Sequence, residues 1–117
     1  MTAGKEFYDR QVAFLESGDV EGLINSQYHN DAVIISFDFT KRGHDALVQH
    51  FKEYLAHLGG LKLKSTDKFT ETEDSIYFEA TVTVGAGEAK VYDVFMLRDG
   101  KATHHFTGLI SFIPKGS

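Results

Sequence analysis

The amino-acid sequence predicts an α+β domain, in which a curved antiparallel sheet packs against three helices. Within residues 1–60, three stretches have apolar side chains recurring at helical spacing. From residue 61 onward apolar and polar residues alternate, and short runs of Gly, Asp and Ser separate the alternating segments. A chain of 117 residues has the size of one domain, so we expect a single domain over residues 1–117 with the order α-α-β-α-β-β-β-β.

Helical periodicity covers residues 5–17, 20–28 and 44–58. Gly18 and the Gly59-Gly60 pair follow the first and third of these segments, as is typical where a left-handed residue ends a helix. Asp19 precedes the second segment and is a typical N-cap. Tyr54 and His57 lie at the edges of the third helix's apolar stripe, which makes them alternative candidates for the mouth of a pocket.

A first strand is expected over residues 32–39. His29-Asn30-Asp31 before it has the composition of a turn, and residues 40–43 after it are expected to form a loop. Ser36 and Asp38 are the two polar residues of this otherwise apolar strand, and alternate residues of a strand face the same side. Both are therefore candidates for a polar site on one face. Further strands are expected over residues 61–72 and 76–84.

Residues 90–113 are predicted to form a hairpin, because Asp99-Gly100 lies between two runs of apolar, β-branched and aromatic residues. Asp93 is the only charged side chain in its row of the first strand, and an ionised carboxylate is costly to bury among apolar neighbours unless it is paired. A two-residue turn would place Asp93 opposite Phe106. A three-residue loop with a bulge would place it opposite His105.

Composition argues against several classes of function. The chain has no cysteine, so neither a disulfide nor a thiolate metal site can form. Three histidines of the third helix are spaced by six and seven residues, which does not bring two ligands onto adjacent turns, and no metal or cofactor is predicted. A net charge of −5 with dispersed basic residues argues against nucleic acid as a partner. No apolar run is long enough for a membrane span or a secretory signal, so we expect a cytoplasmic protein without membrane contact.

Four segments have characteristic local sequences: 12–19 (VAFLESGD), 28–33 (YHNDAV), 43–47 (GHDAL) and 92–101 (YDVFMLRDGK). In this order the chain resembles the nuclear transport factor 2-like superfamily, to which ketosteroid isomerases, scytalone dehydratases and SnoaL-like polyketide cyclases belong. The resemblance implies a cone-shaped sheet around the helices, with an apolar pocket at its wide end. It identifies a fold that carries many activities and also some non-enzymes.

The resemblance can be followed residue by residue. In ketosteroid isomerases a protonated Asp and a Tyr of the first helix form the oxyanion hole, and an Asp of the first strand is the general base. These positions fall on Asp93, Gln11 and Ser36, so one of three matches and steroid isomerisation is not expected. The acid/base Asp of SnoaL-like cyclases falls on Thr107, and an imidazole of some relatives falls on His105. Both turn toward the family pocket, which favours the three-residue loop.

Two functional hypotheses follow. In the first, the protein is a cofactor-independent isomerase, dehydratase or cyclase that acts on an apolar carbonyl compound, with His105 as base and Asp93 as its orienter or as a neutral donor. In the second, it is a non-catalytic domain for small-molecule binding or dimeric assembly. In both, the pocket holds a small apolar molecule, and its expected lining around Asp93 and His105 comprises Gln11, Ser36, Asp38, Tyr54, Phe95 and Thr107.

The opposite face of the hairpin is also apolar, and helices on the other side of the sheet cannot cover it. An exposed apolar patch on a folded domain usually marks an interface. We therefore expect a homodimer through this face, with two-fold symmetry. Its expected residues are Tyr92, Val94, Met96, Phe106, Ile110 and Phe112.

Overall fold

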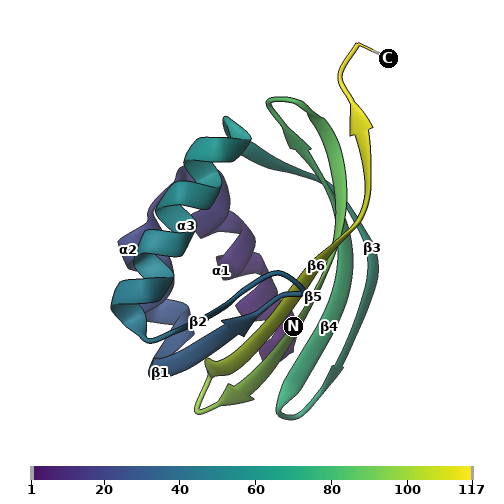
Figure 1. The fold of residues 1–117 in the computed structure, drawn as a ribbon. Coiled ribbons are helices and arrows are strands. Elements are labelled where there is room, and N and C mark those ends of the chain that lie inside the picture. Colours follow the sequence, from purple (N-terminus) through teal and green to yellow (C-terminus); the bar gives the residue numbers. More distant parts are fainter. Residues whose placement is uncertain (1, 117) are drawn as a thin grey trace.

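The computed structural model describes residues 2–116 and has three helices and six strands. All three helices lie on one side of a curved sheet (Figure 1). The elements in chain order are α1 (Ala3–Ser17), α2 (Val20–Gln27), β1 (Tyr28–Ile35), β2 (Thr40–Arg42), α3 (His44–Leu58), β3 (Leu61–Thr72), β4 (Ser75–Val84), β5 (Gly87–Arg98) and β6 (Lys101–Pro114).

The predicted helix signals act as expected. The Asp19 side chain accepts a hydrogen bond from the Gly22 N–H at 3.0 Å, which satisfies one of the free donors at the start of α2. Gly18 and Gly59 have the left-handed backbone that ends α1 and α3. The α+β class and the order of its helices are therefore confirmed.

The sheet has the strand order β2-β1-β6-β5-β4-β3. The strands β3 to β6 form an antiparallel meander, as predicted, but β1 pairs parallel with β6, so the sheet is mixed. The short strand β2, in a segment expected to be a loop, pairs antiparallel with β1. Parallel pairing is possible because β1 and β6 are far apart in the chain and need no tight turn between them.

The first predicted strand is displaced. The strand β1 begins at Tyr28, directly after α2, and His29-Asn30-Asp31 lies inside it rather than in a turn. The pairing with β6 is shifted between Tyr28 and Val33, so these turn-forming residues are accommodated by an irregularity within the strand. The strand ends at Ile35, and residues 36–39 form the connection to β2, closed by a hydrogen bond from the Ser36 N–H to the Phe39 carbonyl.

Neither predicted register of the last hairpin is correct. Arg98 pairs with Lys101 across a two-residue turn in which Asp99 and Gly100 both have positive φ. A bulge between the Met96 and Leu97 pairs then adds one residue to β6, so Asp93 lies opposite Thr107. His105 and Thr107 nevertheless lie on the predicted face of the sheet, the same face as Asp93. The extra residue of the bulge shifts the pairing of the two strands by one residue, as the three-residue loop would have done. Asp93, His105 and Thr107 all turn to the concave side and line one cavity.

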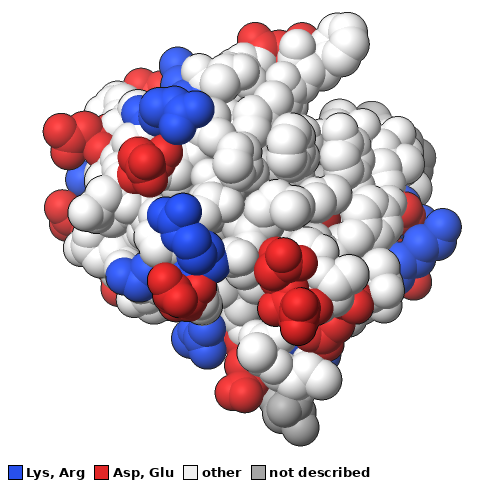
Figure 2. Space-filling model, turned by 90° about the horizontal axis from the view of Figure 1, so that it is seen from below, with Lys and Arg blue, Asp and Glu red and all other residues white. Residues whose placement is uncertain are grey.

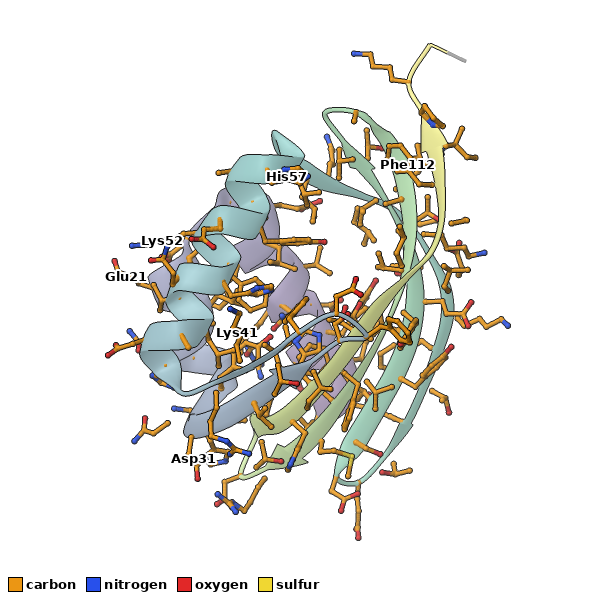
Figure 3. All side chains as sticks on the ribbon, in the orientation of Figure 1. Glu21, Asp31, Lys41, Lys52, His57 and Phe112 are labelled. Atoms are coloured by element: carbon orange, nitrogen blue, oxygen red, sulfur yellow. The ribbon has the colours of Figure 1, made fainter. Side chains whose placement is uncertain are left out.

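The predicted position of Phe112 on the opposite face of the hairpin is wrong, because of a second bulge. The register of β5 and β6 shifts between Lys90 and Val91, so Ala89 pairs with Phe112 and Phe112 turns to the concave side. Figure 3 shows Phe112 near the end of β6, level with the end of α3 where His57 is labelled. This residue therefore belongs to the rim of the cavity rather than to the opposite face.

The core lies between the helices and the concave face of the sheet. Its largest fully buried apolar side chains are aromatic or aliphatic, and each contributes about 1.5–3 kcal/mol by leaving water. They come from α1, α2, α3 and the sheet: Tyr8, Tyr28, Phe7, Phe95, Leu23, Ile24, Ile34, Leu47 and Ile76.

None of the described helices combines the length and apolar character required to cross a membrane. On the face seen in Figure 2, Lys and Arg side chains are interspersed with Asp and Glu instead of forming a basic patch among the described residues.

Candidate active site

A cavity of about 320 Å³ lies between the helices and the concave face of the sheet. Its walls are mainly aliphatic and aromatic, and Asp93 is the only Asp, Glu, Lys or Arg among the lining residues. An apolar enclosure with a few convergent polar groups is the usual form of a small-molecule site. The polar side chains on its wall are Tyr8, Gln11, Ser36, His50, Tyr54, Asp93, His105 and Thr107.

The predicted pair of Asp93 and His105 is present. Asp93 Oδ1 lies 2.6 Å from His105 Nε2, although the two residues are not directly opposite each other across β5 and β6. His105 pairs with Phe95, and the two rings stack with centroids 3.9 Å apart. His105 is only 4% exposed. Packing and hydrogen bonding therefore hold His105 in one orientation.

The second nitrogen of His105 is occupied as well. Nδ1 lies 2.8 Å from the hydroxyl of Tyr28, the buried first residue of β1. Burial raises the pKa of Tyr28 well above its ordinary value, so this hydroxyl is protonated at neutral pH and can donate. Neither nitrogen of His105 is left free for a ligand.

Only one of the two carboxylate oxygens of Asp93 is hydrogen-bonded among the described residues. Its Oδ1 is used by His105, and Oδ2 makes no hydrogen bond to any residue within 2–116. In that part of the chain every side-chain nitrogen or oxygen that is buried from solvent has a hydrogen-bond partner. Because Oδ2 has no partner, it is not among the buried atoms and is accessible to solvent. The carboxylate thus presents one open oxygen to a mainly apolar cavity.

Tyr54 provides a second polar group on the cavity wall. Burial, and then the charge of Asp93, raise the pKa of Tyr54 to about 12, so its hydroxyl is protonated at neutral pH. No described residue forms a hydrogen bond with this hydroxyl, which is free to donate to a ligand. It lies one turn along α3 from His50, and the two rings stack at 6.0 Å.

His50 also lines the cavity. Burial lowers its pKa, and the neighbouring His105 and Lys41 act in the same direction. The imidazole is therefore neutral at pH 7. It packs against Phe39, with ring centroids 4.6 Å apart.

Residues 7–105 match the family described as the SnoaL-like domain. The chain belongs to this family. No curated protein sequence matches the chain.

Solved structures share the fold of this SnoaL-like domain. A candidate isomerase of the SnoaL-like family from Agrobacterium tumefaciens has a TM-score of 0.81 at 13% identity, covering 95% of this chain and all (100%) of its own. TerC, co-crystallised with polyporic acid, has a TM-score of 0.77 at 21% identity, covering 93% and 92%. AclR, a candidate hydroxylase from Streptomyces galilaeus, has a TM-score of 0.75 at 20% identity, covering 91% and 87%. At these identities the likeness establishes the fold, and other similar structures are described as nuclear transport factor 2-like.

Most of the predicted site residues of the SnoaL-like domain meet in the cavity. Gln11, Ser36, Tyr54, Phe95 and Thr107 line it together with Asp93 and His105. Gln11, however, uses its amide within the protein: it donates to the Tyr28 hydroxyl at 3.0 Å and accepts from Gln27 at 3.3 Å.

Asp38 does not reach the cavity. Because β1 ends at Ile35, Asp38 falls in the 36–39 connection, where it is exposed. Ser36 remains on the cavity wall, since it follows directly from the strand. His57, the alternative to Tyr54, is exposed and does not line the cavity either.

Sequence reasoning missed Tyr28, Gln27 and His50. Tyr28 was expected as the last residue of the second helix, over residues 20–28, whereas it begins β1 and its hydroxyl reaches His105. His50 lies four residues before Tyr54 in α3, and residues at this spacing share one face of a helix. The prediction that Tyr54 lines the pocket therefore also indicated His50. Gln27 gave no signal, because a polar residue at a helix end is ordinarily solvated.

Proposed function

We propose that this SnoaL-like domain is a cofactor-independent enzyme that moves a proton next to the carbonyl group of an apolar compound, with Asp93 as the general base. The open Oδ2 of Asp93 carries this proposal: Asp93 is the only carboxylate among the described residues that line the cavity, and Oδ2 makes no hydrogen bond to them. The sequence favoured His105 as base, but both of its ring nitrogens are engaged by protein. His105 is better suited to hold the carboxylate.

The proposed step uses groups that already face the cavity. Asp93 Oδ2 takes a proton from the carbon next to the carbonyl, and the electron pair of that C–H bond moves to give an enolate. The Tyr54 hydroxyl donates a hydrogen bond to the enolate oxygen, where negative charge develops. If the enolate is conjugated with a C=C bond, return of the proton from Asp93 to the far carbon of that bond completes an isomerisation. If the neighbouring carbon carries a hydroxyl, the electron pair of the enolate forms a new C=C bond, and the hydroxyl leaves as water with the proton held by Asp93, which completes a dehydration.

The apolar walls favour an uncharged substrate, because within residues 2–116 no Lys or Arg lines the cavity to pair with an anion. Among the similar structures, one was crystallised with polyporic acid and another is described as a candidate isomerase, which supports a small organic ligand and proton transfer. Isomerisation, dehydration and cyclisation all begin with a step of this kind.

Deuterium exchange tests the proposal whatever the final product of the reaction is. The protein is incubated in D₂O with a panel of apolar ketones and lactones, and loss of the proton next to the carbonyl is followed by NMR. We expect Asp93→Asn to slow this exchange by about 10²–10⁴-fold, the usual contribution of an acid–base group, while ligand affinity stays within about tenfold.

Asp38→Asn is the matched control, because it makes the same chemical change on an exposed connection outside the cavity. It should exchange at the wild-type rate. An Asp93→Asn variant that also exchanges at the wild-type rate would show that Asp93 is not the base.

A non-catalytic binding or assembly domain is the second proposal. One observation favours it: several polar atoms in the wall are already used within the protein, including the Tyr8 hydroxyl, which bonds Thr66 at 2.5 Å, and both nitrogens of His105. In this case panel compounds would bind, as measured by calorimetry, without any exchange above the solvent background.

A further inference from the structure

A chain of hydrogen-bonded side chains runs from the protein surface to the back of His105. It begins at Arg10 and passes through Gln27, Gln11 and Tyr28. We infer that Tyr28, oriented by Gln11 and Gln27, is a positioning residue that keeps His105 neutral and protonated at Nε2, so that Asp93 stays an unpaired carboxylate base. This inference rests on the role of Asp93 proposed above.

The donor and acceptor roles along this hydrogen-bonded series are set at Gln27, the end away from His105. The Arg10 guanidinium can only donate, and its Nε lies 3.1 Å from Gln27 Oε1. The Phe7 carbonyl can only accept, and it lies 2.9 Å from Gln27 Nε2. Two independent contacts therefore orient the same amide: the oxygen of Gln27 faces Arg10, and its nitrogen faces the protein interior.

This orientation passes from one side chain to the next. Gln27 Nε2 also lies 3.3 Å from Gln11 Oε1, which must accept, so Gln11 turns its nitrogen toward Tyr28. Gln11 Nε2 then donates to the Tyr28 hydroxyl oxygen at 3.0 Å. The hydroxyl has a single proton, and among the described residues its remaining partner is His105 Nδ1 at 2.8 Å. Tyr28 is therefore the donor, and Nδ1 accepts.

The same order fixes the proton on His105. Because Nδ1 accepts, the imidazole carries its proton on Nε2 and donates it to Asp93 Oδ1 at 2.6 Å. The opposite tautomer would place the bare Nε2 against a carboxylate oxygen. A doubly protonated ring would direct Nδ1–H at Tyr28 and leave the buried hydroxyl proton without an acceptor, which is unfavourable. One protonation state satisfies every donor and acceptor.

The titratable groups that face His105 come from three elements: Asp93 from β5, Tyr28 from β1 and His50 from α3. Burial lowers the pKa of His50, which is thus uncharged at neutral pH, and Tyr28 keeps its proton. Asp93 is the one charge beside the ring. Without the Tyr28 hydroxyl, Nδ1 would be free to take a proton, and Asp93 would become half of an ion pair and a weaker base.

Nitrogen-15 NMR of the histidine rings tests this inference directly. At pH 7 we expect the wild-type His105 to show one protonated nitrogen, Nε2, and one unprotonated nitrogen, Nδ1. In Tyr28→Phe we expect both nitrogens to be protonated. In the deuterium-exchange assay the same variant should lose about tenfold or more in rate, because the efficiency of a base follows its proton affinity.

Two further variants test the relay, by which we mean the hydrogen-bonded series from Gln27 through Gln11 and Tyr28 to His105. Gln11→Glu offers Tyr28 only an acceptor, so the hydroxyl should turn to Glu and release Nδ1; we expect the doubly protonated ring again, even if Tyr28→Phe folds poorly. Tyr54→Phe removes a cavity hydroxyl that does not bond His105 and should leave the ring spectrum unchanged.

A wild-type ring protonated at Nδ1 at pH 7 would overturn the inference. So would Tyr28→Phe and Gln11→Glu rings that match the wild type. The NMR result is independent of turnover, so the relay can hold even if Asp93→Asn shows that Asp93 is not the base. The tautomer of His105 and the role of Asp93 as base are thus tested by separate measurements.

Discussion

At the scale of single residues, the site depends on which polar atoms are left open. His105, Gln11 and Tyr8 all reach the cavity wall, yet their hydrogen-bonding atoms are used within the protein. Five other lining side chains keep polar atoms that form no hydrogen bond among the described residues: Ser36, His50, Tyr54, Asp93 and Thr107. The proposed step uses two of these open groups, Asp93 Oδ2 and the Tyr54 hydroxyl. One is an acceptor and the other a donor, which is the pair that proton removal next to a carbonyl requires.

Tyr54 leads to a prediction about pH. Its pKa is raised from 10.0 to about 12, so the folded state holds this proton more tightly than the unfolded state. The corresponding stability is fully present below pH 10 and is lost as the pH rises toward 12, by up to about 3 kcal/mol at about 1.4 kcal/mol per pKa unit. Denaturant unfolding of wild type and Tyr54→Phe across this range measures the difference.

The Asp93 charge contributes to the same shift, so Asp93→Asn should lower the pKa of Tyr54. Tyrosinate absorbance, with Tyr54→Phe as the reference, resolves this group from the other tyrosines. If the pKa of Tyr54 is the same in Asp93→Asn and in wild type, the two side chains do not interact in the cavity.

At the scale of elements, bulges decide which side chains meet. The bulge near Met96 restores the face of His105 after a two-residue turn, and the one near Lys90 brings Phe112 to the rim. A shift of one residue turns every following side chain to the other face of a strand. The cavity therefore depends on the turn and on both irregularities of β6.

The turn of this hairpin can be tested by substitution. Gly100 has φ +79°, a left-handed conformation that costs a residue with a Cβ about 1–2 kcal/mol, and we expect Gly100→Ala to lose stability by this amount in urea unfolding. Asp99 also has positive φ, at 54°, but Asn tolerates it, so Asp99→Asn should be neutral. If Gly100→Ala unfolds at the wild-type urea concentration, the two-residue turn is not the one in solution.

At the scale of the whole molecule, the two faces of the sheet have different surroundings. The concave face carries the helices and the cavity. On the other face Met96 and Phe106 are each 39% exposed and Ile110 is 47% exposed, next to the partly buried Tyr92 and Val94. These five residues form the convex patch, and the described helices do not cover it (Figure 1).

We expect the convex patch to form a two-fold symmetric homodimer. Phe106→Glu would place a charge in the centre of the interface, where burial without a partner is unfavourable. Sedimentation should therefore show a dimer for the wild type and a monomer for Phe106→Glu, with the fold retained in circular dichroism.

Phe37→Glu is the matched control for this prediction. Phe37 is 100% exposed in the connection between β1 and β2, outside the convex patch, so the same chemical change should leave the dimer intact. A wild type that sediments as a monomer, or a Phe106→Glu variant that stays dimeric, would show that the convex patch is not the interface.

The sequence by itself determined the fold class, the three helices and the last four strands. These features depend on local periodicity, caps and turn residues, which are visible over ten to fifteen residues. It also singled out Asp93, the one charge in its row of the hairpin, whereas His105 was preferred over Phe106 as its partner because of the family resemblance. The tertiary structure decided what is not local: the parallel pairing of β1 with β6, the displacement of Asp38 from the cavity and the inward turn of Phe112. It alone brought Gln11, Gln27 and Tyr28 behind His105, since α1, α2 and β1 meet β6 only when the helices pack on the sheet.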